Sequence, residues 1–505
     1  MSDAPLILGV SGLRGIVGQS LTPEVAVRYA AAFGAWLRER TGSESPTVVV
    51  GRDGRKGGEA VCEAAVAGLL ASGCYVTKLG VATTPTVGLV CGIEADAGIV
   101  VTASHNPAEW NGLKCLVCDE VPVDAEEDAF DSVARAPNAQ EADEIISLFK
   151  GDFEYPTFTH DRAIETQSDA PYIHEFQCSF WMDNLLDQPI RDRFANDGSL
   201  GFTCVLDAVN CSGSTVAVPF LESLGIFIGL NCSNSGIFPH TPEPTRENLS
   251  GEGGLCDAVP GLKADIGFAQ DPDADRLAIV DEKGEYIGEE YTLALCAMSI
   301  LDAMGDDAKG SVLVANLSTS RMIDDVAAKY GARVERTPVG EANVVERMLA
   351  LKHAGERVVL GGEGNGGVIW PEVVYVRDSL GSMALTLALM ARTGKSVSQL
   401  VHDINALSAG GSGYAIVKRK VDIASKADAE PAVRAVSAWA KAIDGARTDT
   451  QDGVRVDFES GDWTGSWVHV RASNTEPIMR LICEAPTEAT AAAVLTATEQ
   501  AIAGN

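Results

Sequence analysis

The sequence predicts an α/β protein built from several domains. A chain of 505 residues is too long for one hydrophobic core, so we expect about three or four domains. Three segments, beginning at residues 47, 203 and 311, open in the same way, with a buried strand, a polar loop and a helix. This repetition predicts three α/β domains of similar topology with mixed sheets. The last hundred residues alternate short strands with alanine-rich helices, which is typical of a smaller α+β domain.

The individual elements follow from runs of apolar residues and the turn residues between them. In the first segment we expect a strand at 47–50, a helix at 59–72 that stops at Gly73, and further strands at 74–80 and 98–103. The second and third segments pair strands at 203–210 and 311–320 with helices at 214–225 and 321–331. The C-terminal strands are expected at 413–421, 453–459, 466–473 and 478–485. The stretch 121–170 is rich in Asp and Glu and predicts an acidic helix and a connection between the first two domains.

Composition narrows the class of protein. The net charge of −32 argues against nucleic acids and anionic membranes as partners. An anionic ligand would therefore need a local cluster of arginines and lysines. The N-terminus lacks a basic signal region, and no stretch approaches the roughly 20 apolar residues of a membrane span, so we expect a soluble cytoplasmic protein. Cys115 and Cys118 form a CxxC without a second pair, so most of the twelve cysteines are expected to be buried hydrophobes.

The stretch TASHNP, residues 102–107, follows an apolar strand directly. Ser, Asn and Pro are turn residues, so a plain turn is one interpretation. The other is that Ser104 is a nucleophile or a phosphoryl carrier at the tip of the strand. The stretch lacks the G-x-S-x-G pattern of hydrolase nucleophiles, which speaks against a serine hydrolase.

The stretch DPDADR, residues 271–276, places three carboxylates at alternate positions: Asp271, Asp273 and Asp275. Such charges repel one another unless a cation neutralises them, and oxygen ligands alone favour Mg²⁺ over Zn²⁺. A calcium EF-hand would also match Glu282 at its twelfth position, but Arg276 replaces its turn glycine and strands flank the motif. A solvated acidic turn remains the alternative.

Two further loops offer ligand-binding groups. GGEGNGG, residues 361–367, contains G-x-G-x-x-G, but a β-rich stretch follows where a dinucleotide site needs a helix. Its Glu363 and Asn365 suit sugar hydroxyls. RASNTEP, residues 471–477, combines a guanidinium, hydroxyls and an amide that could form a phosphate cradle or a simple turn: Arg471, Ser473, Asn474 and Thr475.

Several cations lie in glycine-rich or polar loops, where the alternative is ordinary surface charge. Arg14 lies in GLRG, and Arg52 and Arg55 lie in GRDGR. Lys114 follows Ser104 by ten residues and could serve as a catalytic base or contact a phosphate.

Taken together and in this order, the motifs SGLRG, TASHNP, DPDADR, GEGNGG and RASNTEP resemble those of the α-D-phosphohexomutase family. GRDGR, HTPEPTRENL at 240–249 and TPVG at 337–340 are secondary similarities. The resemblance covers nearly the whole chain. It implies four domains around one central cleft, with boundaries that we place at 1–165, 166–290, 291–408 and 409–505. It also implies an isomerase that acts on sugar phosphates as a monomer or a homodimer.

The resemblance also implies a role for each motif. Ser104 would be the phosphoserine, and it would hold one Mg²⁺ per chain together with Asp271, Asp273 and Asp275. Arg14, His105 and Lys114 would line the reacting centre, and Arg276 would lie beside the metal loop. Glu363 and Asn365 would hold sugar hydroxyls. The phosphate that does not react would be held by Arg471, Ser473, Asn474 and Thr475.

The implied reaction has two phosphoryl transfers. The phosphoserine donates to a hexose phosphate, and the resulting 1,6-bisphosphate turns over in the cleft and returns its other phosphate to Ser104. A hexose 1,6-bisphosphate would therefore prime the enzyme. A sugar-phosphate-binding protein without activity is the alternative class, although it would have no use for Ser104 beside three aspartates.

Three departures from the family pattern concern the substrate. Pro272 replaces a glycine that is common in the metal loop, and Asn365 and Gly367 replace a serine and a histidine of the sugar loop. Glu341 follows TPVG, where phosphoglucosamine mutases tend to carry an acid. A carboxylate there would pair with the ammonium of glucosamine phosphate, which favours a phosphoglucosamine mutase over a broad phosphomannomutase/phosphoglucomutase. Glu341 could equally be an acid at a helix N-terminus.

Overall fold

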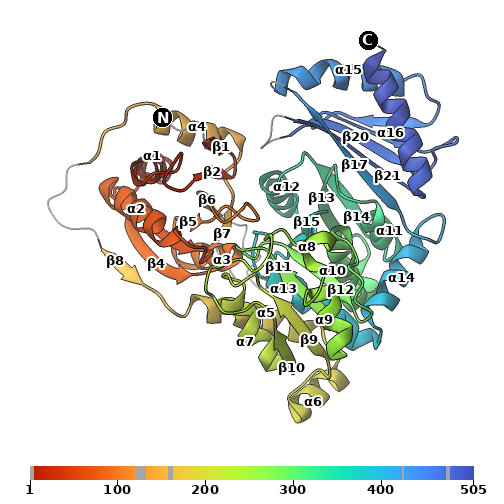
Figure 1. Cartoon of the computed structure of the whole chain (residues 1–505), viewed down its shortest axis with the longest axis horizontal. Coiled ribbons are helices and arrows are strands. Elements are labelled where there is room, and N and C mark those ends of the chain that lie inside the picture. Colours follow the sequence, from red (N-terminus) through yellow and green to blue (C-terminus); the bar gives the residue numbers. More distant parts are fainter. Residues whose placement is uncertain (1–4, 121–131, 157–162, 424–425, 474–477, 505) are drawn as a thin grey trace.

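The computed structural model describes residues 5–120, 132–156, 163–423, 426–473 and 478–504. They form four sheets with their covering helices, arranged as three α/β domains followed by a smaller C-terminal one (Figure 1). This confirms the predicted fold class. Within the described residues, no helix is both long enough and apolar enough to cross a membrane.

The first domain has a mixed sheet of order β1-β2-β6-β5-β3-β4-β8, with β7 beside β6. Strands β3, β4, β5 and β8 are parallel, and the others join antiparallel. The strands are β1 (Ile7–Gly9), β2 (Gly12–Ile16), β3 (Thr47–Arg52), β4 (Tyr75–Val81), β5 (Ala97–Val101), β6 (Trp110–Glu120), β7 (Ser132–Arg135) and β8 (Ile164–Thr166). The helices are α1 (Pro23–Thr41), α2 (Gly58–Ala71), α3 (Thr84–Glu94) and α4 (Ala139–Lys150).

Helices α5 (Ala170–Leu185) and α6 (Gln188–Asp197) lead into the second domain. Its sheet has the order β10-β9-β11-β12, with β12 antiparallel. The strands are β9 (Thr203–Asp207), β10 (Ile226–Gly229), β11 (Ile266–Gln270) and β12 (Leu277–Asp281). The helices are α7 (Ser214–Leu224), α8 (Arg246–Leu249) and α9 (Leu255–Leu262).

The third domain repeats this order as β14-β13-β15-β16. Its strands are β13 (Val312–Asn316), β14 (Arg333–Thr337), β15 (Val358–Glu363) and β16 (Gly367–Ile369). Its helices are α10 (Glu289–Met304), η1 (Gly305–Ala308), α11 (Met322–Lys329), α12 (Glu341–His353), α13 (Ser379–Thr393) and α14 (Val397–Leu407).

The three α/β domains share one four-stranded core. The order β4-β3-β5-β6 in the first domain matches β10-β9-β11-β12 and β14-β13-β15-β16 in the others, and the last strand is antiparallel each time. The turn that enters this last strand carries TASHNP in the first domain, DPDADR in the second and GEGNGG in the third. All three motifs therefore occupy the same topological position, beyond the carboxyl end of a central parallel strand, where open α/β sheets bind ligands.

The C-terminal domain is an antiparallel sheet of order β17-β21-β20-β19-β18. Its strands are β17 (Ala415–Asp422), β18 (Ala446–Asp449), β19 (Val454–Phe458), β20 (Trp467–Ala472) and β21 (Ile478–Ala485), and its helices are η2 (Lys426–Ala429), α15 (Glu430–Ala440) and α16 (Glu488–Ala503). Arg471 and Ala472 of RASNTEP end β20, and the antiparallel β21 begins at Ile478, directly after the motif in the sequence.

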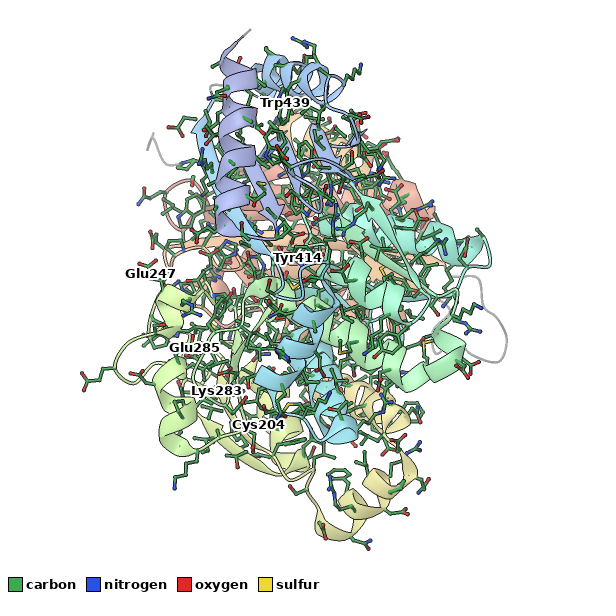
Figure 2. The ribbon with its side chains drawn as sticks, turned by 90° about the vertical axis from the view of Figure 1, so that its right-hand side faces the viewer. Cys204, Glu247, Lys283, Glu285, Tyr414 and Trp439 are labelled. Carbon is green, nitrogen blue, oxygen red and sulfur yellow. The ribbon has the colours of Figure 1, made fainter. Side chains whose placement is uncertain are left out.

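The hydrophobic cores show which domains are packed as one body. One continuous cluster of buried residues includes Val49 of the first domain, Phe268 of the second and Leu313 of the third. The C-terminal domain has its own core, and the partly buried ring of Trp439 packs against it (Figure 2). Polar contacts join it to the third domain, for example the hydroxyl of Tyr414, which donates to Asp325 at 2.6 Å.

Candidate active site

The serine loop, TASHNP at 102–107, and the metal loop, DPDADR at 271–276, are in direct contact. Ser104 is 3% exposed, and its Oγ donates to Oδ2 of Asp271 at 2.7 Å. Its backbone is left-handed, with φ of 48°, a conformation that L-residues seldom adopt outside functional sites and special turns. The N–H of Ser104 donates to Oγ1 of Thr102 at 2.9 Å, which helps to fix this turn. The loop thus presents the hydroxyl to the aspartates.

The buried side chain of Arg55 supports the backbone of the serine loop through hydrogen bonds. It is 1% exposed, pairs with Asp53 at 2.7 Å, and donates to the carbonyl oxygen of Ser104 and to that of Trp110. The surface-charge interpretation is therefore wrong for Arg55. A loop that must hold a strained serine uses the buried guanidinium as a rigid, multiply bonded support.

His105 lies with its Nδ1 3.3 Å from Oγ of Ser104. Burial lowers the pKa of its imidazole to about 3, and the nearby guanidinium groups of Arg276 and Arg14 act in the same direction. His105 is therefore neutral at physiological pH. Arg14 is held by Asn106 at 3.0 Å, in the same part of the site.

The three aspartates of DPDADR are 0–1% exposed, and one oxygen from each lies within 4.8 Å of the others. Burial and the neighbouring carboxylates raise the pKa of Asp271 and of Asp273. Burial also opposes ionisation of Asp275, but Arg377, Lys114 and Arg276 hold its pKa well below the usual range. Three acids in one buried cluster resist ionising together unless a cation joins them.

The donor set fits a hard divalent cation. Oδ1 of Asp273 and Oδ1 of Asp275 are buried without a hydrogen-bond partner among the described residues. Buried carboxylate oxygens are normally paired, and oxygen-only ligands suit Mg²⁺. Strands β11 and β12 flank the turn, so the EF-hand alternative, which needs helices, is wrong.

A cationic cluster lies beside the aspartates. Nζ of Lys114 is 3.1 Å from Asp275 and 3.4 Å from Glu341. Burial alone would lower the pKa of Lys114, but these carboxylates outweigh it and raise the pKa, so the side chain is an ammonium. Lys114 is thus suited to neutralising a phosphate rather than to acting as a base. Lys114, together with Arg14 and Arg276 near His105, supplies local positive charge. An anionic ligand needs such a cluster in a chain whose net charge is −32.

Arg377 joins three acids and is a residue that the sequence analysis missed. Its guanidinium donates to Asp275 and, at 2.8 Å, to Glu363, and lies 3.5 Å from Glu341. The sequence does indicate this role, because Arg377 and Asp378 end an apolar stretch. Charges in such a place are expected to be buried and therefore to need partners.

Hydrogen bonds hold the sugar loop in place. Some come from the third domain, to which the loop belongs, and one comes from the second domain. Oε1 of Glu363 accepts from Asn316 at 2.8 Å and from the N–H of Gly340 at 3.2 Å. The carbonyl oxygen of Gly366 accepts from Leu277 at 2.9 Å, an approach that leaves no room for a Cβ. The motif is a hairpin between antiparallel β15 and β16, so the helix that a dinucleotide site needs is absent here. Nδ2 of Asn365 donates to Glu363 at 3.4 Å.

The phosphate loop, RASNTEP at 471–477, contributes the guanidinium of Arg471. Nε of Arg471 donates to Oδ2 of Asp452 at 2.7 Å, and the same oxygen accepts from the N–H of Val339 in TPVG at 3.1 Å. Nη2 of Arg471 is buried and unpartnered among the described residues. Ser473 is 2% exposed, and its N–H donates to Ile478. Asn474 and Thr475 lie outside the described residues.

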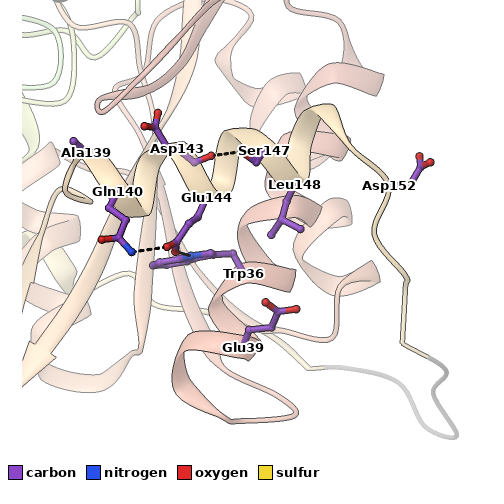
Figure 3. A pocket seen from close by; sticks show the side chains of 9 residues that line it. All are labelled: Trp36, Glu39, Ala139, Gln140, Asp143, Glu144, Ser147, Leu148 and Asp152. Carbon is purple, nitrogen blue, oxygen red and sulfur yellow. Dashed lines mark hydrogen bonds between the residues drawn. The ribbon is translucent and has the colours of Figure 1, made fainter.

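A separate hollow of about 760 Å³ lies between α1 and α4 (Figure 3). Trp36 lines it together with acids, among them Glu39, Asp143 and Glu144. No described residue of the five motifs borders this hollow, and its acidic lining does not suit a sugar phosphate.

Comparison with known proteins decides the family. Models described as phosphoglucomutase/phosphomannomutase domains I, II, III and the C-terminal domain match residues 5–137, 181–284, 289–407 and 416–501. A phosphoglucomutase/phosphomannomutase of Thermococcus kodakarensis is 36% identical over 494 residues, which cover 95% of both chains. The chain belongs to the phosphoglucomutase/phosphomannomutase family. Members of this family are phosphohexomutases, isomerases that transfer phosphate within a sugar phosphate.

Two further relatives extend this result. A protein named probable phosphoglucosamine mutase from Methanopyrus kandleri is 35% identical and covers 95% of this chain and 94% of its own. A crystal structure of a phosphoglucomutase/phosphomannomutase family protein from Burkholderia thailandensis superposes with a TM-score of 0.75 at 25% identity and covers 98% and 96% of the two chains. The fold of the phosphoglucomutase/phosphomannomutase family thus extends over nearly the whole chain.

Proposed function

We propose that this phosphohexomutase interconverts hexose 6-phosphates and hexose 1-phosphates through a phosphoserine at Ser104. The observation that carries the proposal is the left-handed Ser104, whose Oγ faces Asp271 at 2.7 Å in a buried cluster of three aspartates. A plain turn does not require this arrangement, and a strained residue at a site of converging charge indicates function.

In the first transfer, a sugar hydroxyl attacks the phosphorus atom of phosphoserine 104. The bond from phosphorus to Oγ breaks as the bond to the sugar oxygen forms, and the product is a hexose 1,6-bisphosphate. The attacking hydroxyl loses a proton and the leaving Oγ gains one. His105 is neutral and its Nδ1 lies 3.3 Å from Oγ, so we assign it the relay of this proton to Oγ. Arg14 and Lys114 remain cations that offset phosphate charge. In the second transfer, the other phosphate returns to Ser104 and leaves the isomerised monophosphate.

Asp271, Asp273, Asp275 and the phosphorylated Oγ of Ser104 would hold one Mg²⁺, which would supply charge neutralisation and Lewis acidity when bound. Arg276 lies beside this loop, with Nε 3.8 Å from Asp275. The aspartates therefore serve to hold the reacting phosphate and Ser104 in one geometry, since phosphoryl transfer depends mainly on positioning.

The sugar and the distant phosphate need their own contacts. We assign the sugar hydroxyls to Glu363 and Asn365, and the phosphate that does not react to Arg471, Ser473, Asn474 and Thr475. The buried Nη2 of Arg471, which has no hydrogen-bond partner in the described part of the chain, supports this assignment, because a bound phosphate would supply an acceptor. A hexose 1,6-bisphosphate would bind at both ends and would restore phosphate to an unloaded Ser104.

For the sugar, we propose glucosamine phosphate as the preferred substrate. Several relatives at 30–35% identity carry the name probable phosphoglucosamine mutase. Glu341 is the first residue of α12 and is 9% exposed, and it already pairs with Lys114 and Arg377. A substrate ammonium would therefore share this carboxylate with the two cations that already pair with it. Broad phosphomannomutase/phosphoglucomutase activity is the second candidate, since the 36% identical relative carries both names.

The test is to compare kcat/KM for glucosamine, glucose and mannose phosphates, with Mg²⁺ and a bisphosphate primer. A clear preference for glucosamine phosphate supports the proposal, and similar values for glucose and mannose phosphates support the broad activity. Glu341→His then examines the role of the carboxylate. If this variant keeps the preference for glucosamine phosphate, Glu341 does not determine it.

A further inference from the structure

We propose that His174, on helix α5 outside the reacting centre, is a positioning residue for the metal loop. It joins the N-terminal ends of helices α3 and α13, and these two ends hold the turn that contains Asp273 and Asp275. The proposal rests on the proposed function only in taking these aspartates as metal ligands.

The turn at the centre of the metal loop needs support. Ala274 has φ of 55°, a left-handed conformation that is strained for a residue with a Cβ. From one side, the N–H and Oγ1 of Thr84 donate to the carbonyl oxygen and Oδ2 of Asp273 at 2.9 and 2.6 Å. From the other side, Oγ of Ser379 donates to the carbonyl oxygen of Ala274 at 2.6 Å.

These two supports are the first residues of two helices from different domains. Thr84 begins α3 of the first domain, and Ser379 begins α13 of the third. Arg377, two residues before Ser379, donates to Asp275. The distance between the starts of α3 and α13 therefore sets the spacing of Asp273 and Asp275.

His174 connects the two helix starts behind the loop. Its Nδ1 lies 2.9 Å from Oγ1 of Thr86 on α3, and its Nε2 lies 3.1 Å from Oδ2 of Asp378. Asp378 caps α13 by accepting from Leu380 and Gly381 at 2.8 and 3.0 Å. His174 and Thr86 are 0% exposed and Asp378 is 1% exposed, so water cannot replace either bond.

Cys178 lies beside His174 and Asp378, and all three are residue types that can bind a metal. Sγ of Cys178 lies 3.7 Å from Oδ2 of Asp378, and a His, Cys and Asp set can bind zinc. However, His174 and Asp378 have protein partners for both ring nitrogens and both carboxylate oxygens, and neither residue contributes an unpartnered buried atom among the described residues. Hydrogen bonds account for the cluster, so we infer a bridge rather than a second metal centre.

The test compares His174→Leu, which removes both hydrogen bonds, with His174→Gln, which keeps an acceptor and a donor. Thr86→Val removes the bond to His174, and with it the 2.7 Å bond to Oγ1 of Thr83, at nearly constant volume. Cys178→Ala is the matched control, because it lies one turn along the same buried face of α5 and removes only the long thiol contact with Asp378, while both hydrogen bonds of His174 stay in place. Each full-length protein is first confirmed to be folded by its melting curve, and Mn²⁺ binding is then measured by electron paramagnetic resonance, without substrate.

We expect His174→Leu to weaken Mn²⁺ binding by about 10-fold or more, which is typical of lost outer contacts around a metal. Thr86→Val should weaken it in the same direction, His174→Gln should restore much of the affinity, and Cys178→Ala should bind as the parent does. The Mg²⁺ concentration for half-maximal activity should rise in parallel, with little change in KM for the sugar phosphate.

Unchanged Mn²⁺ affinity in folded His174→Leu and Thr86→Val would overturn the proposal. So would one equivalent of zinc in the purified protein that Cys178→Ala loses, because a second metal centre would then replace the bridge. If the parent protein lacks mutase activity but binds Mn²⁺, the proposed function fails, while the comparison of metal affinities still decides the role of His174.

Discussion

Oγ of Ser104 donates to Oδ2 of Asp271 at 2.7 Å across 167 residues of sequence. The two residues lie in equivalent turns of two domains that share one four-stranded core. Repetition of the same core places such turns at matching sheet edges, and packing of the domains brings the edges together. The site is therefore built from similar turns with different side chains.

Ser104→Ala should abolish turnover while leaving the fold intact. The hydroxyl carries the phosphoryl group in both transfers, so we expect kcat to fall by about three orders of magnitude or more. The melting temperature should change little, because alanine removes one polar atom from the site and fills no new space. A coupled assay of mutase activity and a melting curve check both statements. Activity near that of the parent would contradict the phosphoserine mechanism.

Asp273→Asn should make the metal-free protein more stable and should weaken metal binding. Burial and neighbouring carboxylates raise the pKa of Asp273, so its charge destabilises the metal-free fold. In EDTA the variant should therefore be more stable than the parent. It should also lose the rise in melting temperature that Mg²⁺ gives the parent. Thermal melts with EDTA and with Mg²⁺ test this, and a parent that is indifferent to Mg²⁺ would argue against the site.

Arg377→Met should be strongly destabilising. The guanidinium contacts Asp275, Glu341 and Glu363, all at most 9% exposed, and its loss would leave these acids without their shared partner. Breaking a buried ion pair from one side costs about 3–5 kcal/mol. Urea unfolding measures the change, with Arg333→Met as a control at an exposed ion pair. Equal effects of the two substitutions would show that Arg377 does not organise the site.

Asp452→Asn should weaken substrate binding more than catalysis. Asp452 holds Nε of Arg471 at 2.7 Å and also accepts from Val339, so it aims the guanidinium and joins the C-terminal domain to TPVG. Loss of the charge-assisted bond should raise KM about 10-fold with a smaller change in kcat. Steady-state kinetics test this, and Asp449→Asn, in the neighbouring strand β18, is the control. A fall in kcat alone would place Asp452 outside phosphate binding.

Glu290 should make the protein less stable as the pH rises. Burial raises the pKa of its carboxyl from about 4.5 to about 8. Between these values the unfolded chain releases the proton while the folded chain keeps it, so stability present below about pH 4.5 is lost as the pH approaches 8. Glu290→Gln should therefore gain on the order of 2–4 kcal/mol relative to the parent at pH 8 and little at pH 4.5. Urea unfolding at both pH values measures the difference, and a gain that is independent of pH would contradict the assignment.

The sequence predicted the parts of the site that local chemistry determines. Turn residues and acidic spacing identified the loops of Ser104 and Asp271, and apolar runs identified the flanking strands, because these patterns depend on neighbours along the chain. Thr84, His174 and Asp452 were missed, since each matters through contacts with residues that are distant along the chain. Arg55 was interpreted as an even choice between surface and site, because its burial depends on packing that no local pattern encodes.

The central claim is tested most directly by peptide mass spectrometry of the purified protein before and after incubation with a hexose 1,6-bisphosphate. We predict that the peptide containing Ser104 gains the mass of one phosphoryl group, that fragmentation places it on Ser104, and that glucosamine 6-phosphate then removes it. A Ser104 that stays unmodified, in protein that nevertheless interconverts hexose phosphates, would contradict the account.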